Sequence, residues 1–225
     1  MKRYTHLTEA LQACLMQATR GYVQGIAFIA DASKEADIEA KWAEVYGTGL
    51  PAWKRYERKK KGLPNSWACT MPVPGRPKMR QYVLLATEFQ ADKLDSRSPW
   101  LREKWRPIDE LEIGDFVIRR DRRDRRDYAT TVRLTGRALR GLEQHWRALA
   151  QKDLQQLVHD VRRAVAFYPA FGGVRRQLRR LIRGYAKLYT KRLGKPWPGP
   201  DPERLPSLIG FRGANRRAPA DVENV

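Results

Sequence analysis

The sequence predicts an α+β protein with a ferredoxin-like (split βαβ) central sheet, an extra basic hairpin, an N-terminal helix and a three-helix C-terminal region. Strand-like and helix-like runs follow one another in the order β-α-β-β-α-β between residues 22 and 120. Pro74-Gly75 separates two of the strand-like runs as a hairpin turn would. Beyond residue 134, apolar residues recur at helical spacing. The ferredoxin-like fold hosts many unrelated activities, so this prediction alone assigns no function.

The first elements are predicted from apolar spacing and from glycine stops. Leu7, Leu11 and Leu15 fall on one helical face, and Gly21 offers a C-terminal stop. The β-branched and aromatic run over 22–30 then predicts a strand.

The next helix is expected between Ser33, a favoured N-cap residue, and Gly47, which can close a helix in the left-handed conformation. Residues 48–65 are basic and interrupted by Gly and Pro, and they predict an irregular loop. The strand-like runs 67–73 and 80–87 follow on either side of the Pro-Gly turn.

The remaining elements are predicted from capping residues and from strand-like composition. They are a short helix from Ser98-Pro99, a hairpin of strands over 113–120 and 128–134, a helix capped by Thr135, a helix holding Leu154 to Val165, and a helix from Gly172-Gly173 to Gly194.

These patterns divide the chain into three parts. Residues 1–134 form the expected α+β domain, with the basic loop 48–65 and the basic hairpin 113–134. Residues 135–212 are expected to form a basic helical region packed on that domain. The polar segment 213–225 is expected to be a flexible tail.

Composition restricts the class of protein. The 225 residues include 45 Lys and Arg against 25 Asp and Glu, giving a net charge of +20, while 42% of residues are hydrophobic. This hydrophobic fraction is too high for a disordered chain. No apolar run approaches the roughly 18 residues that cross a bilayer, and the N-terminus lacks the apolar core of a signal peptide. Two cysteines make no disulfide framework, so we expect a cytoplasmic location.

The basic residues are concentrated in three segments. Residues 161–200 contain eleven basic residues and no acidic one. On a helical projection of the last helix, Val174, Leu178 and Ile182 share one arc, and the cations are expected on the other side. A polyphosphate backbone would relieve their mutual repulsion; the alternative is a solvated face of a structural helix. The residues expected to bind nucleic acid here are Arg175, Arg176, Arg179, Arg180, Arg183, Lys187 and Lys191.

The second basic segment lies within the expected loop and alternates cations with aromatic residues. Such a mixture suits single-stranded nucleic acid, because cations follow phosphates while aromatic rings stack on bases. The alternative is that the two aromatic residues anchor the loop in the core. The residues concerned are Trp53, Lys54, Arg55, Tyr56, Arg58, Lys59, Lys60 and Lys61.

The third basic segment is the expected hairpin tip, where six arginines alternate with three aspartates. A basic β-ribbon can grip a nucleic-acid backbone, whereas a solvated turn with self-paired charges is the alternative. We expect no metal here, because the flanking guanidiniums oppose a dication. The arginines are Arg119, Arg120, Arg122, Arg123, Arg125 and Arg126.

A search for catalytic chemistry assigns no catalytic residue, metal ligand or cofactor. His6, His145 and His159 do not occur in metal-binding spacings. Tyr185 and Tyr189 fall on the apolar arc of the last helix, which favours core packing over nucleophilic attack.

The sequence therefore predicts a nucleic-acid-binding protein or ribonucleoprotein subunit, acting on RNA or single-stranded DNA through backbone and shape recognition. Its composition resembles that of bacterial mobile-element or phage proteins. Other protein subunits are expected partners, and a membrane is not, although a membrane-surface role for the basic amphipathic helix is a further alternative. The alternative function is a metal-independent RNA-processing endonuclease using His145 or His159, or a divergent plasmid replication or transfer initiator.

Overall fold

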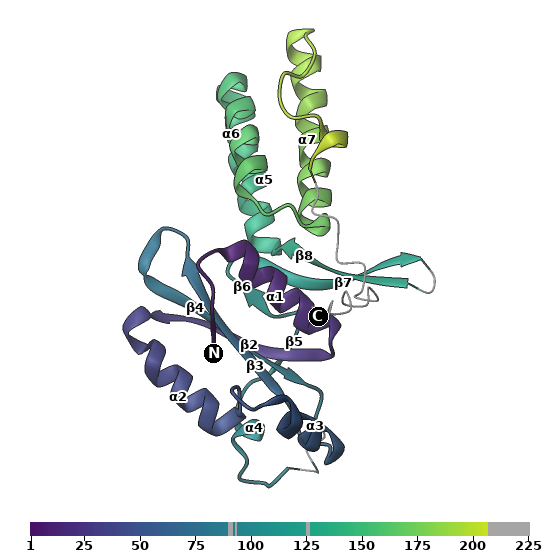
Figure 1. The fold of residues 1–225 in the computed structure, drawn as a ribbon. Coiled ribbons are helices and arrows are strands. Elements are labelled where there is room, and N and C mark those ends of the chain that lie inside the picture. The colour runs from purple at the N-terminus through teal and green to yellow at the C-terminus, as the bar shows by residue number, and fades with distance from the viewer. Residues whose placement is uncertain (90–91, 93, 125–126, 207–225) are drawn as a thin grey trace, which may run out of the picture.

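The computed structural model describes residues 1–89, 92, 94–124 and 127–206, with the backbone alone over 120–124 and 127–129. It confirms a mixed α+β protein with two sheets (Figure 1). In chain order the elements are β1 (Lys2–Arg3), α1 (Leu7–Thr19), β2 (Tyr22–Asp31), the 3₁₀ turn η1 (Ala32–Lys34), α2 (Glu35–Tyr46), α3 (Ala52–Lys60), β3 (Ser66–Val73), β4 (Arg76–Thr87), α4 (Pro99–Arg102), β5 (Arg106–Pro107), β6 (Glu112–Ile113), β7 (Phe116–Asp124), β8 (Asp127–Leu134), α5 (Gly136–Lys152), α6 (Leu154–Phe167), α7 (Gly172–Leu193) and the 3₁₀ turn η3 (Pro202–Arg204).

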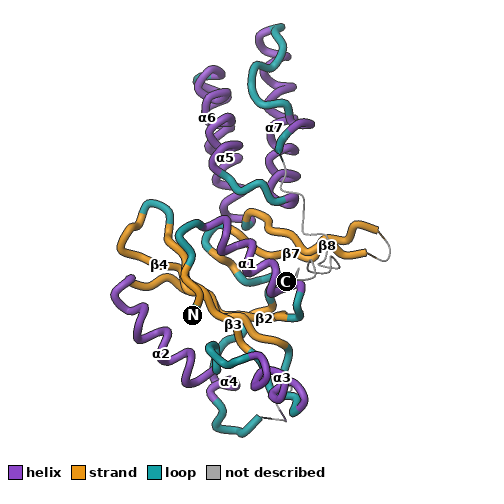
Figure 2. The backbone as a smooth tube through the Cα atoms, viewed as in Figure 1, coloured by secondary structure: helices purple, strands orange, loops and turns teal. Residues whose placement is uncertain are grey.

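The larger sheet has five strands in the order β1-β3-β4-β2-β5. Figure 2 labels its long strands β2, β3 and β4. Strand β1 runs parallel to β3, and the other neighbours are antiparallel. The predicted turn between β3 and β4 is confirmed, with Gly75 at a φ of 72°. Only glycine adopts this left-handed conformation without steric cost, so the residue fixes the hairpin.

One expected strand is wrong in its placement. The run 113–120 was expected as a single strand of the central sheet, but it is divided at Gly114, where φ is +61°. The chain turns back there, so that β6 pairs with the start of β7 in a separate sheet of order β6-β7-β8. The two-residue strand β5 lies beside β2 instead. The expected pairing of 113–120 with 128–134 is present as β7 and β8.

Both faces of the larger sheet are buried, because alternate residues of its central strands point to opposite sides. Met71, Val83 and Leu85 pack with α1 in one core cluster. Tyr82 and Leu84 pack with α2 and α4 in a second cluster. Figure 1 shows α1 and α2 on opposite sides of the sheet.

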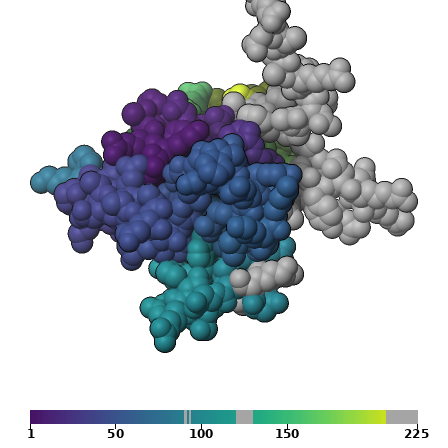
Figure 3. Space-filling view, turned by 60° about the horizontal axis from the view of Figure 1, so that its bottom comes forward, coloured from purple at the N-terminus to yellow at the C-terminus, as the bar shows by residue number. Residues whose placement is uncertain are grey.

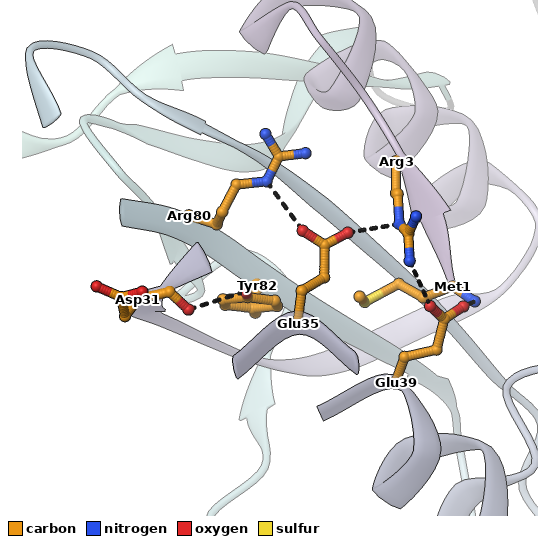
Figure 4. A network of polar contacts seen from close by, with 7 residues as sticks. All are labelled: Met1, Arg3, Asp31, Glu35, Glu39, Arg80 and Tyr82. Carbon is orange, nitrogen blue, oxygen red and sulfur yellow. Dashed lines mark hydrogen bonds and ion pairs between the residues drawn. The ribbon is translucent and has the colours of Figure 1, made fainter. Parts of the chain in front are cut away.

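An ion-pair network joins β1 to the start of α2 and to β4 (Figure 4). The Glu35 carboxylate forms ion pairs with Arg3 Nε at 2.5 Å and with Arg80 Nε at 3.3 Å. Glu39, one turn later, pairs with Arg3 Nη2 at 3.1 Å and with the N-terminal amine of Met1. The network fixes the edge strand against the helix that covers it.

The start of this helix differs from the expected cap. Asp31, rather than Ser33, supplies the capping carboxylate, and its Oδ1 accepts the Ser33 backbone N–H at 2.9 Å. A 3₁₀ turn comes first, and α2 begins only at Glu35. The expected end at Gly47 is confirmed by its left-handed conformation.

The segment 48–65 was expected to be irregular, and this is wrong over α3. Its helix breakers stand at its borders: Pro51 is the N-cap residue, and Gly62 follows the helix with a φ of 69°. The ten residues between them include no Gly or Pro. Proline is tolerated at a helix start because the first N–H groups need no intrahelical acceptor.

Helices α5, α6 and α7 form an arm that rises from the sheets (Figure 1). Thr135 caps α5 as predicted, its hydroxyl accepting the Ala138 N–H at 3.2 Å. At the base of the arm, the N–H of Gly173 donates to Thr131 Oγ1 at 3.0 Å. The core cluster under α1 continues into the arm through Trp146 and Ile182, so one core serves both regions.

Within the described part of the chain, no helix combines the length and the apolarity needed to cross a bilayer.

Candidate nucleic-acid interface

Helix α3 is held on the body by its half-buried side and by the turn that follows it. Arg58 Nε donates to the Pro64 carbonyl at 2.9 Å, and Asn65 Nδ2 donates to the Arg55 carbonyl at 3.0 Å. Burial lowers the pKa of the Arg58 guanidinium from its ordinary value. Arg58 therefore holds α3 on the body of the protein. Because its guanidinium is partly buried and already bonded to the Pro64 carbonyl, the predicted contact of Arg58 with a phosphate is less favoured.

The outer side of α3 exposes both of its aromatic rings. The side chains of Trp53 and Tyr56 are 59% and 60% exposed, which excludes the alternative that they anchor this segment in the core. Lys54 Nζ lies 5.2 Å from the Trp53 ring centroid, and Lys60 Nζ lies 4.8 Å from the Tyr56 ring centroid. These are cation–π distances, and the rings and ammonium groups form one outward surface.

The lysines of this helix have no carboxylate partner among the described residues. Lys54, Lys59, Lys60 and Lys61 are exposed, and the ion pairs of the described chain involve none of them. Because their positive charge is not compensated within the protein, a bound polyanion would reduce their mutual repulsion. We call the outer face formed by Trp53, Lys54, Tyr56, Lys59, Lys60 and Lys61 the α3 surface.

A pocket of about 470 Å³ adjoins the α3 surface. Its walls come from α3, the end of α1, the start of β2 and the end of β4, and the cations Arg20, Arg55 and Lys59 line it. Tyr22 and Tyr56 add aromatic surface, and Glu88 is an acidic lining residue. The volume lies in the range of small-ligand sites. Sequence reasoning missed Arg20, because nothing in the sequence indicates that the end of α1 approaches α3.

Helix α7 buries the apolar arc that its sequence predicts. Val174, Leu178 and Ile182 are fully buried, and Tyr189 packs edge-on against the Trp197 ring. The Tyr185 hydroxyl donates to the Glu143 carbonyl at 3.0 Å. The expectation that Tyr185 and Tyr189 serve packing is confirmed.

Arg175 was expected on the exposed side of α7, and this is wrong. Its side chain is 5% exposed, with Nη1 donating to the Val165 carbonyl at 2.9 Å and Nη2 to the Tyr168 carbonyl at 3.2 Å. Arg175 lies three residues before Leu178 and seven residues before Ile182, and residues at these spacings share one helical face. The expectation that Arg175 lies opposite the buried arc therefore misjudged its position on the helix, which adjoins Leu178 and Ile182.

Part of the remaining α7 basic face is covered by the segment 195–206. Arg179 Nε donates to the Pro202 carbonyl at 2.8 Å, and the Arg183 guanidinium pairs with Glu203 at 2.6 Å. Arg176 is exposed. Arg180, Lys187 and Lys191 are also exposed and make no ion pair or hydrogen bond within the described chain. The cations predicted for this helix thus differ in their surroundings. Arg175 is buried, Arg179 and Arg183 contact the segment 195–206, and Arg180, Lys187 and Lys191 are open to solvent.

The expected hairpin tip lies partly outside the described residues. Arg119 is exposed on β7, opposite Thr131 of β8. The backbone of β7 carries Arg120, Arg122 and Arg123, whose side chains lie outside the described residues. Arg125 and Arg126 lie outside the described residues altogether.

Among the described residues, the α3 surface and the cations of α7 do not form one continuous patch. In Figure 1, α3 lies at one end of the molecule and α7 stands in the arm at the other, with the β7–β8 ribbon leaving between them. Figure 3 looks toward the end that carries α3 and shows this blue segment as part of the outer surface. The structure therefore separates the expected footprint into distinct surfaces.

Groups suited to catalysis are sparse on the described residues. His145 Nε2 lies 3.3 Å from Asp160 Oδ2, which also accepts the Trp146 indole N–H at 2.8 Å. His159 is exposed on α6. The described side chains contain no group of three or more His, Cys, Asp or Glu able to hold a metal ion. Cys14 and Cys69 are buried with their sulfurs 3.8 Å apart, and burial raises the pKa of the Cys69 thiol.

Comparison with protein-family models, with curated proteins and with solved structures finds no match to this chain. The geometry of its own residues is therefore the basis for a functional proposal.

Proposed function

We propose that the protein binds single-stranded nucleic acid, either RNA or single-stranded DNA, through the α3 surface. The observation that carries the proposal is the exposure of Trp53 and Tyr56 among lysines that lack a described acidic partner. Exposed rings can stack on bases, and ammonium groups can follow the phosphates between them. A solvated structural helix would have no need for two mostly exposed aromatic rings on its outer side.

The neighbouring pocket supports the same ligand class. Arg20, Arg55 and Lys59 around a volume of about 470 Å³ are suited to the phosphate of a nucleotide whose base has left the stack. The open cations of α7 and Arg119 on β7 offer further phosphate contacts for a longer strand. Recognition by these groups would depend on the backbone and on stacking, and little on base sequence.

We make two further proposals, one on the arrangement of the larger sheet and one on the cellular location and partners of the protein. We infer a split βαβ, ferredoxin-like arrangement for the larger sheet, supported by the antiparallel order β5-β2-β4-β3 with α2 and α4 on one face. We also propose that the protein works in the cytoplasm as part of a nucleoprotein assembly with other protein subunits. The composition of the chain supports this cytoplasmic assembly. The proposal is independent of nucleic-acid binding by the α3 surface.

Fluorescence anisotropy with labelled single-stranded RNA and DNA of about 20 nucleotides tests the proposal, since one binding unit covers up to about 16 nucleotides. We expect the logarithm of affinity to fall steeply with the logarithm of salt concentration. If about five phosphates are neutralised, the slope is roughly −3.5 to −4.5. A salt-insensitive complex, or no binding at low salt, would contradict the proposal.

Paired double variants locate the surface. Lys59→Ala with Lys60→Ala is expected to weaken binding more than Lys187→Ala with Lys191→Ala, which removes the same charge from α7. The reverse order would place the main contact on the arm and overturn the assignment to α3.

The same oligonucleotides, incubated with the protein in EDTA and in Mg²⁺, distinguish binding from cleavage. We expect intact strands in both. Specific cleavage that is lost in His145→Ala or His159→Ala would instead favour the endonuclease alternative.

A further inference from the structure

Strand β2 leaves much of one edge without a strand partner among the described residues. Its pairing with β4 extends from Tyr22 to Asp31, but β5 pairs with it only at Gln24 and Gly25. The segment Ile26–Asp31 therefore borders β4 on one side and has no described strand on the other. Unpaired strand edges offer a ready row of hydrogen-bonding groups to another extended chain.

The peptide groups that point to the open side can be assigned from the pairing of β4. Thr87 N donates to the Asn65 carbonyl at 3.0 Å, so the Thr87 peptide groups face β3. Three residues earlier, those of Leu84 face β2, and its partner Ile26 faces β4 in turn. Successive residues of an antiparallel strand alternate between its two neighbours. Ala27 and Ile29 therefore direct their N–H and C=O groups toward the open edge.

This edge lies in a cleft of about 740 Å³. The cleft runs between the sheet, the β3–β4 hairpin, the β6–β7 turn and the end of α6. Phe28, Ile29 and Phe167 line it, and their side chains are 37%, 41% and 68% exposed. We call this the β2-edge cleft; it combines a free strand edge with apolar surface.

The charged lining of the cleft is mainly basic, with Arg76, Lys104, Arg106 and Arg137 against Glu112 and Asp115. Arg76, Lys104 and Arg106 line it, are exposed, and have no carboxylate partner among the described residues. Arg137 is already paired with Glu112 at 3.8 Å. A ligand that pairs with these cations and covers the apolar side chains of the cleft would carry acidic groups at its ends and apolar groups at its centre.

We propose that the β2-edge cleft binds an extended peptide of a partner protein, with apolar residues at its centre and Asp or Glu on its flanks, as an added strand beside Ala27 and Ile29. Backbone hydrogen bonds supply affinity in this mode, and side-chain pockets supply specificity. Nucleic acid fits less well, because its backbone has no N–H groups to continue a strand ladder. A second copy of this chain is disfavoured because the same cations would face one another.

A display selection provides the probe. Random peptides of about ten residues, long enough for one added strand, are selected on the full-length protein and counter-selected against its Ile29→Lys variant. We expect enrichment of alternating apolar residues flanked by Asp or Glu. Lysine on a strand edge opposes strand addition, so selected peptides should bind Ile29→Lys at least about tenfold more weakly, a loss of about 1.4 kcal/mol.

Two further measurements distinguish strand addition from other modes. A bound peptide should slow hydrogen exchange at the Ala27 and Ile29 amides, whereas contact through side chains alone would leave both amides unchanged and contradict the proposal. Arg106→Glu should weaken acidic peptides in the same direction, and it provides a second variant if Ile29→Lys fails to fold.

Competition identifies the ligand class and keeps this proposal separate from the α3 surface. Labelled single-stranded RNA that displaces the selected peptides and needs Ile29 would assign the cleft to nucleic acid and overturn the peptide proposal. A selection that returns no peptide dependent on Ile29 or Arg106 would overturn it too. RNA binding that is weakened by substitution of Lys59 and Lys60 but unchanged in Ile29→Lys would agree with both proposals. The lysine variants then test the α3 surface, and Ile29→Lys tests the β2-edge cleft.

Discussion

The ammonium group of Lys60 lies 4.8 Å from the centroid of the Tyr56 ring, one helical turn away on α3. Residues four apart share a helix face, so a base stacked on this ring would have a cation beside its phosphate. Lys54 stands similarly over Trp53, at 5.2 Å. Under the proposed function, the two pairs would offer stacking and phosphate contacts at adjacent positions.

Tyr56→Ala tests stacking separately from charge. Base–aromatic stacking contributes about 1–3 kcal/mol per base, so affinity for single strands should fall by about five- to 150-fold. The slope of log affinity against log salt should stay unchanged, because no phosphate contact is removed. Anisotropy titrations at several salt concentrations measure both quantities.

Two controls accompany this prediction. Phe167→Ala removes an aromatic ring of similar exposure far from α3 in the chain and should leave affinity unchanged. Lys59→Ala should reduce the salt slope by roughly 0.7, the contribution of one phosphate contact to a single strand. Equal losses in Tyr56→Ala and Phe167→Ala would mean that general destabilisation, and not stacking, lowers the affinity.

Local patterns predict most of the secondary structure because its determinants are local. Gly75 and Gly194 adopt positive φ angles where a turn and a helix end were expected, and Thr135 caps α5. The division at Gly114 was missed because Phe116 to Arg120 continues the strand-like composition of Ile113. A single glycine in such a run signals either a bulge or a turn, and only tertiary pairing decides between them.

The candidate site was predictable in composition and less so in geometry. The mixture of Trp53, Tyr56 and lysines indicated a single-strand surface, but its helical form and the exposure of its rings depend on how α3 docks. Arg175 shows a different error, since it was grouped with the other cations on the exposed side of α7, although its spacing from Leu178 and Ile182 places it beside the core. The approach of Arg20 to α3 depends on long-range packing, which no local pattern encodes.

Arg175→Ala should destabilise the fold while its neighbour Arg180→Ala does not. The Arg175 guanidinium donates to the Val165 and Tyr168 carbonyls, and burial lowers its pKa from the ordinary value. Hydrogen bonds from charged groups contribute about 1.5–3 kcal/mol, so we expect a loss of that order in the free energy of unfolding. Urea denaturation measures it.

Arg180→Ala is the matched control, since this residue is exposed and has no ion pair or hydrogen bond within the described chain. Its free energy of unfolding should change by no more than about 0.5 kcal/mol. Comparable stability of the two variants would show that Arg175 does not secure the end of α6.

Two glycines of α7 should respond in opposite ways to alanine. A Cβ at Gly173 would lie 2.4 Å from the Val132 carbonyl oxygen, a backbone atom that cannot move without shifting β8. A Cβ at Gly184 meets nothing within 4 Å. Gly173→Ala should therefore lower the thermal midpoint, whereas Gly184→Ala should stabilise the helix by about 0.5–1 kcal/mol. A stable Gly173→Ala protein would mean that α7 and β8 are not in close contact.

Acid should weaken the attachment of β1 to α2 through Glu39. The hydrogen bond from the Met1 amine, followed by the contact with Arg3, lowers the pKa of Glu39 below its ordinary value. A lowered pKa in the folded state means stability that is present above the unfolded pKa, about 4.3, and is lost as pH falls through the folded value. Glu39→Gln should thus reduce the free energy of unfolding at pH 7 by up to about 1 kcal/mol, and this difference should shrink toward zero near pH 2.

Glu44→Gln provides the control for this pH dependence, because Glu44 is exposed on the same helix and has no described ion pair. Its stability should follow that of the wild type at every pH. Denaturation curves test this pH dependence. They are recorded between about pH 2 and pH 7, across the range where carboxylates titrate. A Glu39→Gln effect that is the same at both ends of this range would show that side-chain packing, and not the charge of the carboxylate, holds β1 against α2.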